Sequence, residues 1–203
     1  MEPDSVVVHK TEKKKDNNNV EKTAIMHIQY VDGTAEDTLW FAEEGSKIYM
    51  LLNLDFPGLP AVGSASLGTR WVLIADSKAT SEYTGLEIKG LNIELDVQGA
   101  ALPATLDVIA KGKNEGAETL TIGGKQVQAR RYSTSYGLVV KAQVPFVGQI
   151  TIPVSITGTV KFAKNIGMVY EQQNPISITI PITNETEAIP GFRTQATAYG
   201  NIN

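Results

Sequence analysis

The chain has 203 residues, enough for one generous domain, and it contains no cysteine. Structural disulfides, thiolate metal sites and cysteine nucleophiles are therefore excluded. Its 18 basic and 22 acidic residues give a net charge of −4, which argues against a nucleic-acid-binding surface. No apolar run approaches the roughly 18 residues that a membrane-spanning helix needs.

The first 22 residues are polar and carry five basic and five acidic side chains. Such a segment buries too little apolar area to offset the entropy of ordering it. We predict a flexible polar tether over residues 1–22, followed by a single β-domain over residues 23–203. The alternative is a short edge strand at the β-branched triplet Val6, Val7 and Val8.

Strand patterns dominate from residue 23 onward. The run over residues 23–31 ends at Asp32-Gly33, a dipeptide that favours a tight hairpin. Residues 47–54 are apolar nearly throughout and stop at Phe56, Pro57 and Gly58. The one place where we expect a short helix is residues 60–67. The pattern then predicts three further strands, over residues 71–75, 88–97 and 102–110.

The second half of the chain contains the clearest hairpin signal. Residues 118–122 and 125–134 are strand-like and flank Gly123-Gly124, which supplies the positive φ angles of a two-residue turn. The glycine-rich residues 112–116 are interpreted as another turn. Strands are also predicted over residues 138–147, 150–162, 168–172, 176–182 and 194–199.

The segment QITIPVSITGTVKF, residues 149–162, determines the predicted architecture. Every even position from Ile150 to Phe162 is apolar except Gly158. Thirteen residues would span about 43 Å at roughly 3.3 Å per residue, and strands that long coil or bend. Pro153 and Gly158 are typical of edges and bends. We therefore predict an all-β fold: a strongly curved antiparallel sheet, a half-barrel or open barrel, with at most one or two short helices.

Few residues suggest chemistry. His27 has no neighbouring histidine and is predicted to be a solvent-facing or locally bonded strand residue. The acidic residues Glu43-Glu44 and Glu36-Asp37 lie near turns. Paired carboxylates can divide acid and base roles, as in glycosidases, but turn chemistry explains these residues equally well. The glycine-rich segments do not introduce helices, so they do not form phosphate-binding loops. We predict no catalytic residue, no metal site and no cofactor, and a protein that is not an enzyme.

The apolar even-numbered face of residues 150–162 is a candidate ligand-lining surface, together with the even-numbered isoleucines of residues 176–182. An apolar cluster in residues 51–62 is placed to cover the mouth of a curved sheet. The candidate ligand-binding residues are Leu52, Leu54, Phe56, Ile152, Val154, Ile156, Val160, Phe162, Ile178 and Ile180.

Two segments within residues 117–173, AETLTIGGKQVQARRYSTSY and GTVKFAKNIGMVYEQQ, resemble uncharacterised bacterial cell-envelope lipoproteins of Bacteroidota-like organisms. In that family an aromatic residue precedes a glycine-containing turn into the next strand. Residues 162–169 match this element, with Asn165 in place of its first glycine. Some related envelope proteins are similar to lipoprotein carriers, in which a curved antiparallel sheet half-encloses an apolar cavity. The resemblance implies an exported protein, periplasmic or tethered to a membrane, without known catalytic residues.

The leading hypothesis is a non-enzymatic cell-envelope protein that binds a lipid-like apolar ligand, or an envelope protein partner, through its curved sheet. Membrane contact is expected only through a lost lipid anchor. The alternative is a structural or adhesive β-domain with a filled core, for which the same alternation is expected. An outer-membrane barrel would need aromatic girdles at both ends of its strands, and the sequence lacks them.

Overall fold

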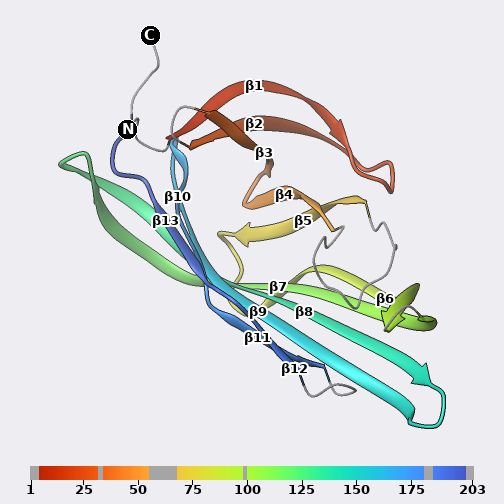
Figure 1. Cartoon of the computed structure of the whole chain (residues 1–203). Helices are drawn as coiled ribbons and strands as arrows, with labels where there is room; N and C mark the ends of the chain where they lie inside the picture. Colours follow the sequence, from red (N-terminus) through yellow and green to blue (C-terminus); the bar gives the residue numbers. More distant parts are fainter. Residues whose placement is uncertain (1–4, 32–33, 55–67, 98–99, 181–184, 200–203) are drawn as a thin grey trace.

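The computed structural model describes residues 5–31, 34–54, 68–97, 100–180 and 185–199. Within these ranges every regular element is a β-strand, and all strand pairs are antiparallel (Figure 1). The sheets curve and do not close, which confirms the predicted fold class. The described residues include no helix of the length and apolarity that crossing a bilayer requires. Both the predicted Asp32-Gly33 turn and the predicted helix over residues 60–67 lie outside the described residues.

The first sheet is a five-stranded meander in which each strand pairs with its neighbour along the chain. Its strands are β1 (Ser5–Lys15), β2 (Glu21–Val31), β3 (Thr34–Glu44), β4 (Lys47–Asn53) and β5 (Thr69–Asp76). The sequence analysis missed β3, because its acidic residues were interpreted as turn residues. Glu36 and Asp37 lie within that strand.

The second sheet has six strands in the order β13-β10-β9-β8-β7-β6. Their bounds are β6 (Tyr83–Val97), β7 (Ala100–Ile122), β8 (Lys125–Val144), β9 (Gly148–Ala163), β10 (Gly167–Gln173) and β13 (Phe192–Gln195). A separate pair, β11 (Ile176–Ile180) and β12 (Glu185–Ile189), forms the third sheet. The sequence analysis missed β12. It placed the last strand over residues 194–199, where the structure has Phe192–Gln195.

The tether prediction is wrong for most of its length, because residues 5–15 form β1 and pair with β2. The turn after β1 is held by Asp16, whose carboxylate accepts hydrogen bonds from the backbone of Asn18 and Val20 at 2.9 Å. Asp16 also accepts a 3.3 Å hydrogen bond from the Trp71 backbone N–H of β5. The alternative prediction, an edge strand at Val6, Val7 and Val8, is confirmed as a strand, but the strand is longer than predicted. Charged side chains suit this edge strand, since they discourage pairing with other chains.

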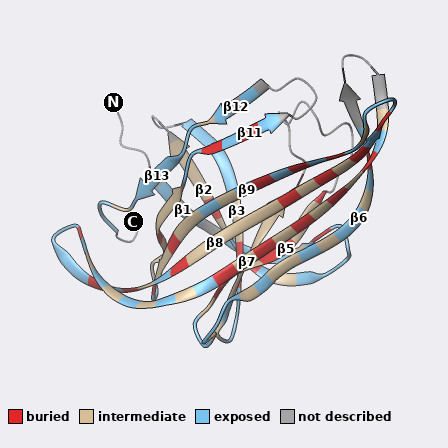
Figure 2. Cartoon of the chain, turned by 90° about the horizontal axis from the view of Figure 1, so that it is seen from below, coloured by how far each residue is buried: buried red, intermediate tan, exposed pale blue. Residues whose placement is uncertain are grey.

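The long strands of the second sheet alternate in burial along their length (Figure 2). β7 runs without interruption through residues 112–116, so the turn predicted there is wrong. A β-bulge between Asn114 and Gly116 replaces it, and Gly116 has a φ of +106°. The extra residue reverses which face the even positions occupy. By contrast, the turn predicted at Gly123-Gly124 is confirmed, with φ angles of +58° and +74°.

Because of that bulge, the far end of the β7–β8 hairpin buries apolar residues on the opposite face of the sheet. The C-terminal segment covers this face through hydrogen bonds from Gly123 N–H to the Thr197 carbonyl, 2.8 Å, and from Ala196 N–H to the Val169 carbonyl, 2.9 Å. The buried cluster consists of Ile122, Val127, Ala129, Ala163 and Val169.

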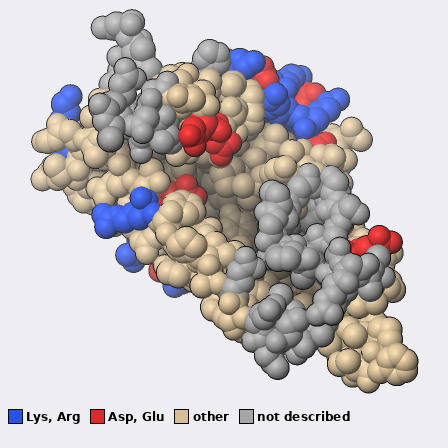
Figure 3. Space-filling model, in the orientation of Figure 1, with Lys and Arg blue, Asp and Glu red and all other residues tan. Residues whose placement is uncertain are grey.

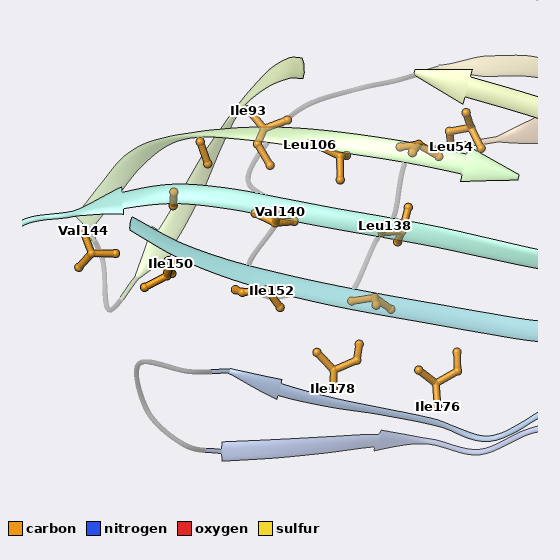
Figure 4. Close-up of a cluster of buried hydrophobic side chains, with 14 residues drawn as sticks. Leu54, Ile93, Leu106, Leu138, Val140, Val144, Ile150, Ile152, Ile176 and Ile178 are labelled. Atoms are coloured by element: carbon orange, nitrogen blue, oxygen red, sulfur yellow. The ribbon is translucent and has the colours of Figure 1, made fainter. Parts of the chain in front are cut away.

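The chain leaves the second sheet at Asn174. Its backbone N–H donates to the Thr157 carbonyl at 2.9 Å, and its side chain donates to the Thr157 hydroxyl at 2.8 Å. Pro175 follows and has no N–H with which to continue the ladder. β11 therefore packs across the face of β9, with Ile176 and Ile178 directed toward that strand (Figure 4).

The first sheet covers the same face of the second sheet further along β9. Phe162 of β9 contacts Phe41 of β3 edge to face, with ring centroids 6.1 Å apart. The apolar cluster between the two sheets contains the buried residues Phe41, Val72, Ile74 and Ala110, with Leu39, Ile48, Met50, Leu52, Leu86, Tyr136, Phe162 and Met168 packed against them. The inner face of β9 is thus covered by β11 at one end and by the first sheet at the other.

Candidate functional site

Four of the predicted ligand-binding residues lie in a filled core. Leu54, Ile152, Val154 and Ile178 are each at most 7% exposed and belong to one buried cluster (Figure 4). Their partners in that cluster come from β6, β7, β8 and β11. Phe56 lies outside the described residues, as does the side chain of Ile180. At this end of β9 the apolar face packs against the protein itself.

The other predicted residues lie where the two sheets meet. Leu52 packs against both the filled cluster and the inter-sheet cluster. Phe162 is partly buried and contacts the rings of Phe41 and Tyr132. Ile156 and Val160 line a cavity. Ile156 also packs against the filled cluster, so it lies at the boundary between the two.

This cavity, which we call the inter-sheet cleft, has a volume of about 40 Å³. Figure 3 shows that the molecule is hollowed on the face seen in the orientation of Figure 1. About 10 to 15 Å³ of such volume holds one water molecule, so the cleft accepts a small group of roughly three heavy atoms. Its lining comes from both sheets: Met50, Ile74, Thr134, Tyr136, Ile156, Thr157, Gly158, Val160, Met168, Glu171, Gln172 and Gln173.

Glu171 of β10 is the one ionisable carboxyl in this lining. It lies opposite Val160 in the sheet register, which directs its side chain to the inner face. No hydrogen bond or ion pair joins its carboxylate to any residue that the structure describes. Burial raises the pKa of Glu171 above the usual range for a carboxyl, because the charged form loses hydration.

Tyr136 of β8 contributes the second titratable group. Burial, and secondarily the negative charge of Glu171, raises the pKa of the Tyr136 phenol to about 12. The phenol therefore stays protonated at neutral pH. Thr134, in the same strand, adds a hydroxyl to the lining. The cleft thus combines largely apolar walls with one carboxyl, the hydroxyl-bearing residues Thr134, Tyr136 and Thr157, and two glutamines, an arrangement suited to a ligand with a polar end.

Gly158 lets the backbones of β9 and β10 lie close together at the edge of the cleft. A Cβ atom there would lie 2.5 Å from the Gln172 carbonyl oxygen and 3.2 Å from the Thr134 hydroxyl. A larger side chain at this position would displace β10 rather than fill empty space.

Of the two environments predicted for His27, solvent-facing or locally bonded, the solvent-facing one is wrong. It is 7% exposed, and its ring lies 4.9 Å from that of Phe41, centroid to centroid. Burial lowers the pKa of His27, because the imidazolium would lose hydration. Within the described ranges, no group of three or more histidine and acidic side chains is arranged to hold a metal ion.

The sequence analysis missed several residues of the cleft, Glu171, Tyr136, Met50 and Ile74 among them. For Glu171 the reason is a bulge in β10 between Met168 and Tyr170. Simple alternation would place Met168 and Glu171 on opposite faces, yet both line the cleft. Nothing in the sequence near residue 169 signals that extra residue.

Comparison of the chain with protein-family models, with curated proteins and with solved structures finds no match. The family resemblance of residues 117–173 therefore stays a prediction.

Proposed function

We propose that the protein is a non-enzymatic binding protein that takes an apolar ligand with one polar end into the inter-sheet cleft. The observation that carries this proposal is Glu171, a half-buried carboxyl with no hydrogen-bond or ion-pair partner among the described residues, which faces a cavity with largely apolar walls. Buried polar groups are normally hydrogen-bonded, so a carboxyl left without a donor is suited to a ligand that supplies one.

The chemistry of the cleft favours a cationic or hydrogen-bond-donating end group. A small group such as a primary ammonium fits about 40 Å³ and would pair with Glu171. The remainder of the ligand would contact Met50, Ile156 and Met168. A whole lipid chain would require the two sheets to move apart, because the cleft is smaller than the 150 Å³ cavity that holds benzene in other proteins. A cell-envelope location belongs to the same proposal, and only the resemblance of residues 117–173 supports it.

The test uses an uncharged dye, N-phenyl-1-naphthylamine, whose fluorescence rises in apolar surroundings. The full chain should bind the dye and release it to decylamine at a concentration at least about tenfold lower than to decanoate, with decanol between them. Glu171→Gln should remove the preference for the amine and keep the response to decanol. Glu115→Gln, at an exposed carboxylate on β7, is the matched control and should change neither.

Failure of the native protein to bind the dye would contradict this proposal. The same would follow if amine and carboxylate displaced the dye equally well.

The packing of Ile152, Val154 and Ile178 favours a second candidate, a structural or adhesive β-domain with a filled core. It predicts no saturable binding of any of the three decyl compounds. For Ile156→Phe it predicts lower stability and, as for the parent, no binding, whereas the ligand-binding proposal predicts that the parent binds all three compounds and that Ile156→Phe binds them more weakly.

A further inference from the structure

The turn between β8 and β9, residues 145–147, exposes two large apolar side chains. Phe146 is 110% exposed relative to an extended reference, and Val147 is 65% exposed. The last buried residue before them is Val144. Figure 1 shows this turn at the free end of the long β8–β9 hairpin, away from the first sheet. Phe146 also has a φ of +65°, a conformation that a residue with a Cβ rarely adopts.

The hairpin around this turn carries no charge. No charged residue occurs between Lys141 and Lys161 in the sequence. Lys141 itself forms a 2.8 Å ion pair with Asp107 of the neighbouring strand β7, so both charges are paired. Two acidic residues lie near this end of the β6 edge. Asp96 pairs in register with Ala101, three positions beyond the Ala104–Ala142 pair on the side of the turn. Glu94 pairs with Pro103, one position beyond the same pair. Glu94 is therefore level with Gln143.

We infer that the β8–β9 turn, with Phe146 at its tip, inserts into the interfacial region of a lipid bilayer. The segment from Gln143 to Phe146 projects roughly 10 Å at about 3.3 Å per residue, which matches the usual depth of interfacial insertion. Insertion to this depth desolvates an aromatic ring and Val147 but no charged side chain of the hairpin. Aromatic residues favour this region of the bilayer.

The size of the exposed tip distinguishes a bilayer from a protein partner. A stable protein interface covers about 800 Å² on each side, with roughly 20 residues. Two apolar residues at a narrow turn provide much less, whereas a bilayer accepts a protruding wedge of any width. The interaction with lipid is expected to be weak and reversible, since two side chains bury little area. It does not depend on the ligand proposed for the inter-sheet cleft.

The first experiment places a reporter at the tip. In Phe146→Trp, vesicles of zwitterionic phosphatidylcholine should shift the emission to shorter wavelength, and phosphatidylcholine with brominated acyl chains should quench it. Trp40 and Trp71 lie in the first sheet, so the parent protein provides the background signal. Phe192→Trp, at a 47% exposed position on β13, is the control and should not be quenched. Absence of quenching at position 146, or equal quenching at position 192, would overturn the inference.

The second experiment removes the apolar side chain and keeps the turn. Asparagine adopts positive φ angles more readily than phenylalanine, so Phe146→Asn should fold as well as the parent. Its vesicle-bound fraction in flotation assays should fall at least about fivefold, because most of the inserted apolar area is lost. Equal binding of both proteins would overturn the inference. So would a lipid-free dimer that Phe146→Asn dissociates in sedimentation equilibrium, since the tip would then bind a second copy of the chain.

Discussion

The two halves of β9 carry one sequence pattern but have different surroundings. From Ile150 to Val154 the inner face packs against β8 and β11 in a filled core. From Ile156 to Val160 the same face lies opposite the first sheet across the inter-sheet cleft. The alternation of apolar residues thus identifies the buried face of a strand. What fills the space above that face depends on other segments.

The covering segments explain the difference. β11 contributes Ile176 and Ile178, two branched side chains that reach β9 directly. Beside the other half of β9, β10 pairs with β9 as the next strand of the sheet and does not cover its inner face. The bulge in β10 turns Glu171 toward that inner face. A carboxyl cannot pack against isoleucine and valine as another apolar residue would, so space remains around it.

The largest expected effect is at the filled half. Ile152→Asp should lower the free energy of unfolding by on the order of 4 kcal/mol, because it buries a carboxylate in an apolar cluster. Thr151→Asp, on the exposed face one residue away, should change it by about 1 kcal/mol or less. Urea unfolding of both variants is the measurement. Similar losses would show that both faces of β9 are buried, and the comparison between its halves would fail.

Overpacking should separate the two halves directly. Val154→Phe adds volume where the core is full and should cost about 1 to 3 kcal/mol of unfolding free energy. Ile156→Phe, two residues along the same face, adds volume next to the cleft and should cost less than about 1 kcal/mol. The difference in urea midpoints between the two variants tests this. Equal costs would mean that the cleft is as tightly packed as the core.

The smallest expected effect is the pH dependence caused by Glu171. Its pKa is raised in the folded state, so the folded protein holds this proton more tightly than the unfolded chain. The contribution of Glu171 to stability should therefore be fully present below the ordinary carboxyl pKa of 4.5 and be lost as pH rises through the raised pKa. Glu171→Gln should abolish that part of the decline in thermal unfolding curves recorded from pH 4 to pH 8, roughly the stable range.

Glu115→Gln is the control of opposite sign. The Ser133 hydroxyl, and secondarily Lys113, lowers the pKa of Glu115, so its contribution is present at neutral pH and lost as pH falls. A Glu171→Gln profile parallel to that of the parent protein would show that the carboxyl is solvated in the folded state.

Particular residues show how much of the fold and of the cleft could be predicted from the sequence. The Gly123-Gly124 hairpin follows from local backbone preference, and the structure confirms it. The structure also places Asn165, which the family resemblance puts in a turn, at a φ of +63°. The inner face of β9 follows from alternation and is confirmed at Ile152 and Val154. β1 was not predictable from its charged composition, because its order depends on Asp16, whose partner Trp71 lies 55 residues away.

The sequence by itself determined the all-β class, the long strands and the apolar face of β9, since backbone propensity and alternation are local properties. Only the tertiary structure decided which parts of that face are filled and which line a cleft. Two bulges, at residues 115 and 169, each add one residue and reverse the faces beyond them. The position of a bulge depends on how a strand must bend against its neighbours, and such contacts join residues far apart in the chain. Glu171 therefore reaches the cleft through packing rather than through any pattern in the sequence around it.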